Sequence, residues 1–360
     1  MIIEDLKLEN FRNFSRSELH FTSKTVFFEG SNGQGKTSLL EAVFYLANLR
    51  SFRTQKLNNL KKIGSQSFHL FMAFIRSQGW KSTLAADCGL VRSLYVDRVP
   101  VSKASDFTGK IKTVVFLPDD PLIITGPSAL RRRFFDMFIS MLDRRYFSVL
   151  QSYFQALSSR NFLLKNKEND ADILRSYSSI LAETGSEIVQ IRKKYVQILS
   201  ELMQKLFTEL YPSLSDFQIT MHYTRESEEK ESYLKKMECD LQKDQIRGFT
   251  AFGPHLDDFD FVFEKKPMRS FGSRGQCRMT SLFLKLSELE ALRQLNGALK
   301  DTVILVDDAT ADLDIRAREA FLEKIREAGQ IFFAFTEIPP EFKFEKSDQF
   351  RIRAGNVEKQ

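Results

Sequence analysis

Short apolar runs alternate with longer amphipathic stretches along this chain. Runs rich in aromatic, aliphatic or β-branched residues are typical of buried strands, and they occur at residues 2–8, 25–29, 68–75, 113–117, 259–263, 302–306 and 330–335. From Leu39 to Ala47 apolar residues recur one helical turn apart, which predicts a helix from Thr37 to about Asn48 with one apolar stripe. Strands interleaved with helices predict an α/β fold.

The middle of the chain has a helical pattern. Apolar residues recur at helical spacing over residues 128–164 and again over 174–210, with a polar break at 165–170 between them. We expect an antiparallel hairpin of two long helices, with a seam too short and irregular for an extended coiled coil. The charged segment 226–247 predicts a surface loop or an exposed helix, and residues 279–299 predict a further helix.

A glycine-rich sequence follows the strand at residues 25–29. It reads Gly30-Ser31-Asn32-Gly33-Gln34-Gly35-Lys36-Thr37, followed by Ser38, and it matches the P-loop pattern G-x-x-x-x-G-K-[ST]. Glycines let backbone N–H groups curl around phosphate oxygens, Lys36 reaches the β- and γ-phosphates, and the Thr37 hydroxyl is a ligand for Mg²⁺. The loop also has the strand before it and the helix after it that this mechanism needs. We therefore expect ATP and Mg²⁺ as cofactors.

Two adjacent carboxylates follow the strand at residues 302–306. In a P-loop protein such a pair is the Walker B site, where Asp307 holds the Mg²⁺ shell and Asp308 orients the attacking water. Without a P-loop, the same residues would be a strand that ends in an acidic turn. Because Lys36 and Asp307 lie far apart in the chain, a large segment is inserted between them. We expect an ATPase lobe formed by residues 1–125 and 246–360, interrupted by a helical lobe at 126–245.

A segment before the helix at 279–299 bears on the class of ATPase. Ser273, Gly275 and Gln276 stand where the N-terminus of that helix would form a second anion-binding cradle. Alone, the segment is better explained as an ordinary capped helix. Its place in the chain matters more, because the order is P-loop, long insert, S-x-G-Q, Walker B and then Asp312-Leu313-Asp314. This order resembles ATPase heads that dimerise head to tail around ATP, where the signature serine of one subunit touches the γ-phosphate bound by the other.

Several motifs are shared with one known family. They are Leu8-x-Asn10-Phe11-Arg12-Asn13-Phe14, the run from Gly33 to Ala42, Leu130-Arg131-Arg132-Arg133-Phe134-Phe135-Asp136, Gly253-Pro254-His255, Ser273-x-Gly275-Gln276-x-Arg278 and Asp307-Asp308. Together, from residue 2 to about residue 340, they resemble the bacterial RecF family within the wider group of ABC-type and structural-maintenance-of-chromosomes ATPases. The resemblance implies a P-loop ABC-type ATPase head with mixed β-sheets and helices, an inserted helical lobe and no long coiled coil.

The resemblance also implies a function and site residues. A RecF-like protein forms an ATP-dependent homodimer on DNA, single-stranded and duplex, at gap junctions, and cooperates with RecO and RecR in loading RecA. Arg12 and Asn13 correspond to the family's nucleotide-contacting loop, although Arg12 is equally explained as a cap of the first strand. The other residues that the resemblance supports are Lys36, Thr37, Asp307 and Asp308 in the roles above, Ser273, Gly275 and Gln276 as the signature acting in trans, and Asp312 and Asp314 at the dimer interface.

The chain departs from the family pattern at two positions and from many ABC-type ATPases at a third. Phe52 and Leu256 stand where the family commonly has His and Arg, so two polar or basic contacts are missing. Asp308 stands where many ABC-type ATPases have Glu, which shortens the catalytic base by one methylene. This difference motivates the hypothesis of slow hydrolysis.

Composition narrows the class of protein further. With 360 residues, of which 42% are apolar and 28% charged, the chain is globular rather than disordered. We see no apolar run long enough for a membrane span and no signal peptide, so we expect a cytoplasmic protein with no membrane partner. Three scattered Cys and four scattered His residues do not form a disulfide framework or a zinc knuckle. The net charge of +6 permits DNA binding but is common in other proteins.

Two alternative functions fit some of these motifs. A chromosome-organising or defence ATPase head would usually carry long heptad arms or a fused nuclease domain, and neither pattern is visible. A nucleotide-binding interaction module without turnover would not need both an intact P-loop and an intact Walker B pair. We therefore favour an ATPase of RecF-like recombinational repair and replication-fork maintenance.

Overall fold

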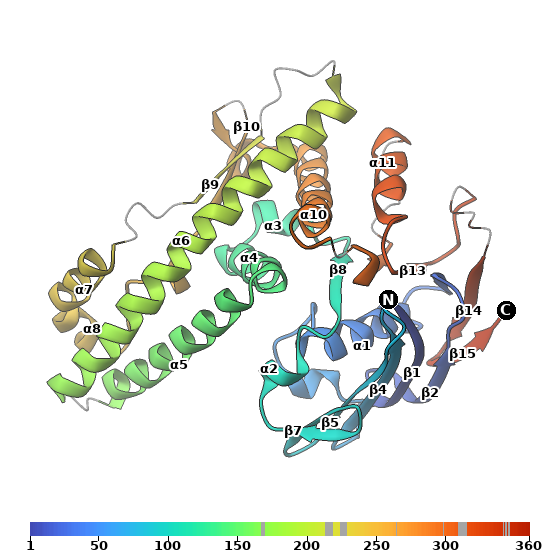
Figure 1. The fold of residues 1–360 in the computed structure, drawn as a ribbon, viewed down its shortest axis with the longest axis horizontal. Coiled ribbons are helices and arrows are strands. Elements are labelled where there is room, and N and C mark those ends of the chain that lie inside the picture. The colour runs from blue at the N-terminus through green and yellow to red at the C-terminus, as the bar shows by residue number, and fades with distance from the viewer. Residues whose placement is uncertain are drawn as a thin grey trace. The chain divides into compact units, whose positions relative to one another are not determined.

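The computed structural model divides the chain into two compact units (Figure 1). Unit 1 comprises Met1–Pro118 and Leu292–Gln360, and unit 2 comprises Asp119–Ala291. The structure describes every residue except 167–169, 213–218, 224–228, 264, 298, 309–314, 341, 343 and 345, and it does not describe the side chains of 219–222 and 296.

A six-stranded sheet forms the centre of unit 1, in the strand order β15-β14-β3-β13-β12-β8. Its strands are β3 (Thr25–Glu29), β8 (Lys112–Phe116), β12 (Thr302–Asp307), β13 (Gln330–Phe335), β14 (Ser347–Arg353) and β15 (Asn356–Lys359). All neighbouring strands are parallel except β14 and β15. Strands β12 and β13 are buried along nearly their whole length, as expected for parallel strands covered on both faces.

A second sheet of unit 1 is antiparallel, in the order β2-β1-β4-β5-β6-β7. Its strands are β1 (Ile2–Phe11), β2 (Phe14–His20), β4 (Phe68–Ile75), β5 (Lys81–Cys88), β6 (Arg92–Val96) and β7 (Val99–Val101). Alternate residues of β4 are buried, so one face of the sheet packs on the core. The described connections of this unit include the short helices η1 (Leu57–Leu60), α2 (Ala104–Phe107) and η4 (Leu299–Asp301).

Helix α1 (Lys36–Asn48) packs on both sheets. It contacts β12 and β13 of the parallel sheet and β1 and β4 of the antiparallel sheet. Every residue from Ser38 to Ala47 is buried, so the helix is covered all round rather than along the single stripe that the sequence predicted. Helix α11 (Ile315–Ile325) packs on β8 through Phe321, whose ring centroid lies 4.9 Å from that of Phe116.

Phenylalanine rings make up much of the core of unit 1. Phe21 packs edge-on against Phe332 and Phe350, with ring centroids 5.1 and 5.6 Å apart. Phe333, the next residue of β13, stacks on Phe27 at 5.2 Å. Successive residues of a strand point to opposite faces, so aromatic layers cover both faces of the parallel sheet. Each such ring pair adds about 0.5–1.5 kcal/mol to the stabilisation from burial.

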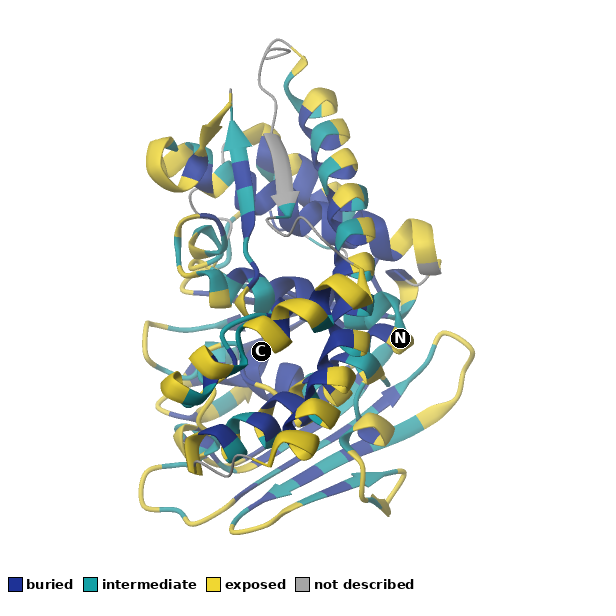
Figure 2. Cartoon of the chain, turned by 90° about the vertical axis from the view of Figure 1, so that its left-hand side faces the viewer, coloured by how far each residue is buried: buried dark blue, intermediate teal, exposed yellow. Residues whose placement is uncertain are grey.

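Unit 2 is largely helical. Its helices are α3 (Pro121–Thr125), α4 (Ser128–Leu142), α5 (Arg144–Asn166), α6 (Ala171–Leu210), α7 (Lys230–Cys239), α8 (Leu241–Arg247), η3 (Pro254–Leu256), α9 (Met268–Phe271) and α10 (Arg274–Asn296), the last of which ends in unit 1. A small sheet contains β9 (Ile219–Tyr223), β10 (Phe259–Phe263) and β11 (Lys266–Pro267), in the order β11-β10-β9. Figure 2 shows buried and exposed positions alternating along the helices, as expected for amphipathic helices. In the described part of the chain, we find no helix with the length and apolar character of a membrane span.

The first arm of the predicted hairpin is two helices rather than one. Helices α4 and α5 are separated at Asp143, whose backbone is extended and whose carboxylate accepts hydrogen bonds from the N–H groups of Arg145 (2.9 Å) and Tyr146 (3.2 Å). An Asp that satisfies the first free N–H groups of a helix is an N-cap. The apolar periodicity continues across this break and therefore hid it. The second arm is the single helix α6, which lies beside α5.

The unit boundaries differ from the expected lobe boundaries. Residues 246–291, expected in the ATPase lobe, belong to unit 2, because β10 pairs along its length with β9 and because α9 contacts both β10 and α3. Pairing between such distant segments leaves no mark in local composition. The charged segment 226–247 contains α7 and α8, and the helix expected at 279–299 begins earlier, at Arg274, and ends at Asn296 before Gly297, whose φ is +57°.

Candidate nucleotide-binding site

The glycine-rich loop connects the end of β3 to the start of α1. Gly30 lies against the backbone of β14, where a Cβ atom would collide with the carbonyl oxygen of Ile352. Gly35 has a φ of +119°, and a Cβ atom there would lie 2.5 Å from Asn13 Nδ2. Only glycine fits at both positions. The loop therefore brings its backbone N–H groups to the start of α1, which is the arrangement that binds phosphate.

The Lys36 ammonium forms hydrogen bonds with the backbone of this loop. It donates to the carbonyl oxygens of Gly30 (2.5 Å) and Ser31 (3.0 Å). Burial lowers the pKa of Lys36, and the nearby carboxylates of Asp307 and Asp308 oppose that shift. An ammonium group interacts more strongly with charged phosphate oxygens than with neutral carbonyls. Phosphate at the loop would therefore compensate the burial of this charge.

Thr37 and Asp307 meet although they are far apart in the chain. The Thr37 hydroxyl lies 3.0 and 2.9 Å from the two carboxylate oxygens of Asp307 and donates to them. Burial raises the pKa of Asp307, the hydrogen bond from Thr37 opposes the rise, and the charge of Asp308 adds to it. Asp308 is exposed, has a φ of +49°, and donates its N–H to the carbonyl oxygen of Ala334 at 3.0 Å. The strand expected to carry Walker B thus ends beside the helix that carries Lys36 and Thr37.

The raised pKa of Asp307 predicts a pH-dependent stability. A carboxyl whose pKa is higher in the folded than in the unfolded chain destabilises the folded state increasingly as the pH rises from the unfolded to the folded pKa, and fully above it. We expect Asp307→Asn to raise the melting temperature of the nucleotide-free protein at about pH 8, and we expect this gain to shrink as the pH falls toward the ordinary pKa of Asp, about 3.9. Differential scanning fluorimetry with a chelator present measures both effects. Asp308→Asn at the exposed neighbour is the control, and a gain that stays constant with pH would contradict a titrating Asp307.

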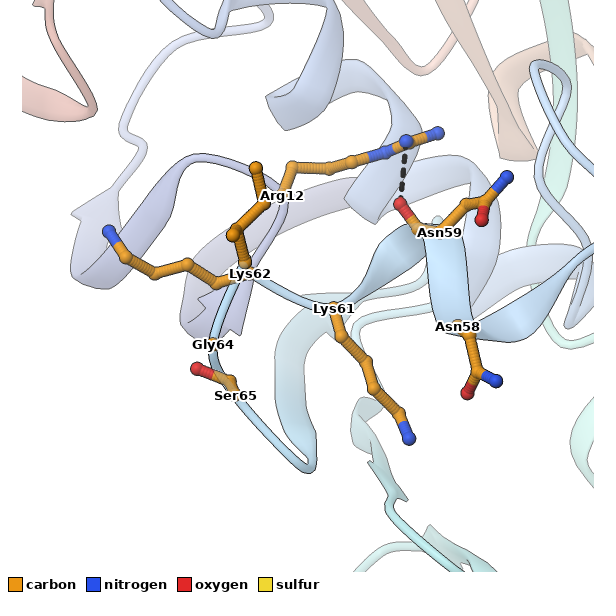
Figure 3. Close-up of a pocket in the computed structure, with 8 residues that line it drawn as sticks. Arg12, Asn58, Asn59, Lys61, Lys62, Gly64 and Ser65 are labelled. Atoms are coloured by element: carbon orange, nitrogen blue, oxygen red, sulfur yellow. Dashed lines mark hydrogen bonds between the residues drawn. The ribbon is translucent and has the colours of Figure 1, made fainter.

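Arg12 is joined to the P-loop helix. Its guanidinium donates to both carboxylate oxygens of Glu41, at 2.7 and 2.6 Å, and to the carbonyl oxygen of Asn59 at 2.7 Å (Figure 3). Glu41 is fully buried one helical turn after Thr37, and it also accepts a hydrogen bond from the Ser51 hydroxyl. A bidentate pair of this kind fixes the guanidinium plane. The side chain of Arg12 is therefore held by α1 instead of capping the first strand.

Asn13 and two segments distant in the sequence donate hydrogen bonds to the P-loop. Asn13 Nδ2 donates to the carbonyl oxygen of Gln34 at 2.7 Å, and Asn13 Oδ1 is buried with no hydrogen-bond partner in the described part of the chain. In the turn between β14 and β15, the N–H of Ala354 donates to Gln34 Oε1 at 2.5 Å. After β13, the Thr336 hydroxyl donates to Asn32 Oδ1 at 3.3 Å. Neither of these two remote contacts has a local signal in the sequence.

The other predicted P-loop residues differ in exposure. Ser31, Asn32 and Gly33 are exposed, whereas Ser38 is buried and donates its N–H to the carbonyl oxygen of Gly35 at 3.0 Å. Residues 31–33 are therefore the part of the loop most open to a ligand, and Ser38 belongs to the first turn of α1.

A polar network behind the P-loop was not predicted. Ser51 Oγ accepts the N–H groups of Arg53 (2.9 Å) and Thr54 (3.0 Å), and Arg53 Nη1 lies 3.8 Å from Glu41 Oε2. A signal was present in the sequence, since Glu41 is a charge among the apolar residues of α1 and such a charge needs a buried partner. Phe52, where the family commonly has His, packs edge-on against Phe44 with ring centroids 5.3 Å apart. The departure at Phe52 therefore gives an aromatic contact in place of a polar one.

The predicted signature residues belong to unit 2, so neither unit contains both the signature and the P-loop. Ser273 Oγ accepts the N–H of Gln276 at 3.2 Å, and Gln276 Oε1 accepts the N–H of Ser273 at 2.8 Å. This reciprocal pair is a capping box at the start of α10. A Cβ atom on the exposed Gly275 would meet no atom within 4 Å. Asp312 and Asp314, expected at the dimer interface, lie outside the described residues.

Comparison with known proteins identifies the family. Residues 1–267 match the AAA ATPase domain family. The chain is 32% identical over 370 residues to the DNA replication and repair protein RecF of Acetivibrio thermocellus, a match that covers 99% of this chain and 100% of the relative. The chain belongs to the RecF family. The RecF of Leptospira interrogans serovar copenhageni is likewise 32% identical over 367 residues, which cover 99% of each protein.

Solved structures extend the comparison to the fold. The recombination mediator protein RecF-ATP of the RecFOR pathway superposes on this chain with a TM-score of 0.89 at 29% identity, covering 99% of this chain and 97% of that one. An Smc head domain from Pyrococcus furiosus superposes with a TM-score of 0.55 at 15% identity, a likeness of fold alone. The predicted P-loop ATPase head with an inserted helical part is confirmed for this member of the RecF family, and so is the prediction of an ATPase.

Proposed function

We propose that this member of the RecF family is an ATP-dependent DNA-binding protein of recombinational repair and replication-fork maintenance. Two copies close around ATP on DNA, hydrolysis reopens them, and the closed form helps RecO and RecR to load RecA at gaps. The observation that carries the proposal is the contact of the Thr37 hydroxyl with Asp307 at 2.9 Å, next to Lys36 of the P-loop. This contact joins the two halves of a nucleotide site that the sequence keeps far apart.

The residues present fit a magnesium ion. Mg²⁺ takes oxygen ligands, uses one or two protein carboxylates and completes its shell with water and phosphate. Thr37 Oγ1 and the Asp307 carboxylate are oxygen ligands that already face each other. Thr37 would hold the ion directly, with Asp307 in or beside its coordination shell. Bound Mg²⁺ would neutralise charge on the β- and γ-phosphates.

The chain's own residues supply the remaining parts of the mechanism. Lys36 exchanges the Gly30 and Ser31 carbonyls for phosphate oxygens, while the loop N–H groups and the start of α1 hold the phosphates. Arg12 and Asn13 line the edge of the nucleotide site. Asp308, exposed after β12, orients the attacking water. Because Asp is shorter than the Glu of many ABC-type ATPases, we expect slow hydrolysis, which suits a timed switch.

A second copy completes the site in this proposal. Ser273 is exposed at the start of α10, and Gly275 leaves open space beside it. The N-terminus of a helix attracts anions through its free N–H groups and its dipole. Ser273, Gly275 and Gln276 of one copy would therefore meet the γ-phosphate bound by the other.

The relatives support the proposed cellular role. The two bacterial relatives are DNA replication and repair proteins, and the solved relative is a recombination mediator of the RecFOR pathway. DNA, RecO and RecR are therefore the proposed partners, and RecA is the protein to be loaded.

Substitutions at Ser273 test whether this residue contacts the γ-phosphate bound by a second copy or only caps helix α10. Asn and Asp both serve as N-cap residues, but Asp adds a negative charge. With a slowly hydrolysed ATP analogue, we expect the native chain to double its mass from 41.7 kDa, Ser273→Asn to dimerise more weakly, and Ser273→Asp to remain monomeric. The cause is repulsion between the new carboxylate and the γ-phosphate across the interface. Light scattering measures the mass, with ADP as the negative control.

Asp308→Asn extends the same experiment to ATP itself. We expect this variant to bind ATP and to lose turnover by about 100-fold or more, so that ATP alone holds the dimer. If Ser273→Asp dimerises as the native chain does, the segment is only a helix cap and the head-to-tail dimer is wrong. A native chain that stays monomeric with every nucleotide, in the presence of DNA, would overturn the clamp mechanism.

A further inference from the structure

Two exposed turns lie at the same end of the antiparallel sheet of unit 1. Residues 62–65 form one turn, before β4, and residues 89–91 form the other, between β5 and β6. Phe68 of β4 pairs with Cys88 of β5, and a Cβ atom on Gly89 would lie 3.4 Å from Ser67 Cβ. The two turns are therefore neighbours.

The first turn presents an aliphatic side chain. The N–H of Ser65 donates to the carbonyl oxygen of Lys62 at 2.9 Å, and Gly64 has a φ of +86°, which are the features of a type II turn. Ile63 occupies the tip, and 98% of its surface is exposed. A polar residue would serve this turn equally well, so the fold does not explain the choice of Ile63.

The second turn presents two more aliphatic side chains. Leu90 and Val91 are 106% and 77% exposed. The N–H of Gly89 donates to the carbonyl oxygen of Val91 at 3.2 Å, which keeps this connection short. We call Ile63, Leu90 and Val91 the apolar tip. Exposed apolar side chains gathered on neighbouring loops mark candidate interaction sites.

Basic residues adjoin the apolar tip in the chain. Residues 42–67 contain no Asp or Glu, and their basic residues are Arg50, Arg53, Lys56, Lys61 and Lys62. Lys61 directly precedes the first turn and Arg92 directly follows the second, so these two cations flank the tip. Asp87, an acidic group at this end of the sheet, is paired with His69 at 2.6 Å.

A pocket lies between the first turn and Arg12. Its lining is mostly polar and basic and comes from Arg12, Asn58, Asn59, Lys61, Lys62, Ile63, Gly64 and Ser65. Figure 3 shows Lys61 and Lys62 pointing in different directions from the backbone. Lys62 donates to Ser15 Oγ at 2.8 Å, which leaves Lys61 as the lysine on the side of Cys88 and Arg92.

We propose that the apolar tip and its flanking cations bind DNA where a duplex meets a single-stranded segment. Lys61 and Arg92 contact backbone phosphates, and Ile63 and Leu90 pack against unstacked bases at the junction. The inference rests on the proposed DNA-binding function at gaps and adds to it the surface of this chain that contacts the DNA.

DNA fits this surface better than a protein partner does. The centres of protein interfaces are depleted of Lys, whereas Lys and Arg make a large share of contacts to DNA phosphates. Apolar side chains such as Ile and Leu also insert between base steps in proteins that hold distorted DNA. Unstacking is least costly where base pairing is already interrupted. A junction is therefore favoured over continuous duplex.

The test compares a blunt duplex with a gapped duplex, using the full chain, fluorescence anisotropy and a series of salt concentrations. Lys61→Gln combined with Arg92→Gln should weaken binding to both DNAs and reduce the slope of log K against log salt by about 0.9 for each phosphate that is no longer neutralised. Ile63→Ser combined with Leu90→Ser should leave the salt slope unchanged and abolish the preference for gapped DNA. With 2-aminopurine at the junction, the native chain should raise the fluorescence by unstacking and the Ile63→Ser variant should not.

Trp80→Ser and Lys81→Gln are the matched controls. They remove an exposed aromatic side chain and an exposed cation at the opposite end of the β4–β5 hairpin, so DNA binding should stay native. If the native chain binds no DNA, the proposed function itself fails. If the native chain binds gapped DNA but either double variant behaves as the native chain or as the controls do, the assignment of this surface is wrong.

Discussion

Lys36→Met should abolish nucleotide binding while leaving the fold intact. The ammonium is buried, and in the nucleotide-free chain its partners are the carbonyl oxygens of Gly30 and Ser31. Met fills a similar space without a charge. The affinity for ATP should fall by about 100-fold or more, because hydrogen bonds to charged groups contribute about 1.5–3 kcal/mol each. Isothermal titration calorimetry with ATP and Mg²⁺ measures the loss.

Lys36→Met should lose ATP binding without losing thermal stability. Since burial lowers the pKa of Lys36, its charge opposes folding, and in the absence of nucleotide Lys36→Met should melt no lower than the native chain. The rise in melting temperature that ATP causes in the native chain should disappear. Lys81→Met, at an exposed lysine in unit 1, is the control and should keep that rise. Native affinity for ATP in Lys36→Met would contradict the P-loop assignment.

Arg192→Met should cause a large loss of stability in unit 2. Arg192 is almost fully buried in α6, and its guanidinium donates to Asp136 at 2.8 Å, to Asp257 at 3.0 Å and to the Tyr146 hydroxyl at 3.0 Å. Removing this cation leaves two buried carboxylates without their counter-charge. Breaking a buried ion pair from one side typically costs about 3–5 kcal/mol, and we expect a loss of this size. Urea unfolding followed by far-UV circular dichroism measures it.

A matched substitution on the same helix tests this explanation. Arg175 lies on α6 with its side chain 70% exposed and 3.5 Å from Asp172, so Arg175→Met should change stability by no more than about 0.5 kcal/mol. Adding Asp136→Asn to Arg192→Met should restore part of the lost stability, because it removes one of the two buried carboxylates that Arg192 balances in the native chain. If the double variant is less stable than Arg192→Met alone, poorer packing rather than unpaired charge is the cause.

The candidate nucleotide site is a region of opposed charges. Burial disfavours the charged forms of both Lys36 and Asp307, and each is held by neutral partners. Phosphate and Mg²⁺ would offer both groups stronger, charged partners. Nucleotide binding should therefore stabilise unit 1, and the cost of burying these two charged groups is compatible with a site that serves binding rather than stability.

Local features of the chain were enough to predict most of the candidate nucleotide site. The P-loop glycines, Lys36 and Thr37 fall within one short segment, and continuous apolar runs marked the buried strands. Strands such as β2 and β14 were not predicted, because alternate residues are polar and their runs look like surface loops. The break at Asp143 was not predicted either. Apolar periodicity reports only the buried face of a helix, so it does not reveal an N-cap residue on the exposed side.

The class of protein could be predicted from local motifs, because the P-loop and the acidic strand end each work through residues adjacent in the chain. Which distant groups meet depends instead on how the elements pack. Thr37 reaches Asp307 because α1 packs on β12, Arg12 reaches Glu41 because α1 also packs on β1, and Gln34 reaches Ala354 because β14 pairs with β3. Such contacts depend on strand order and helix packing, which local periodicity does not encode.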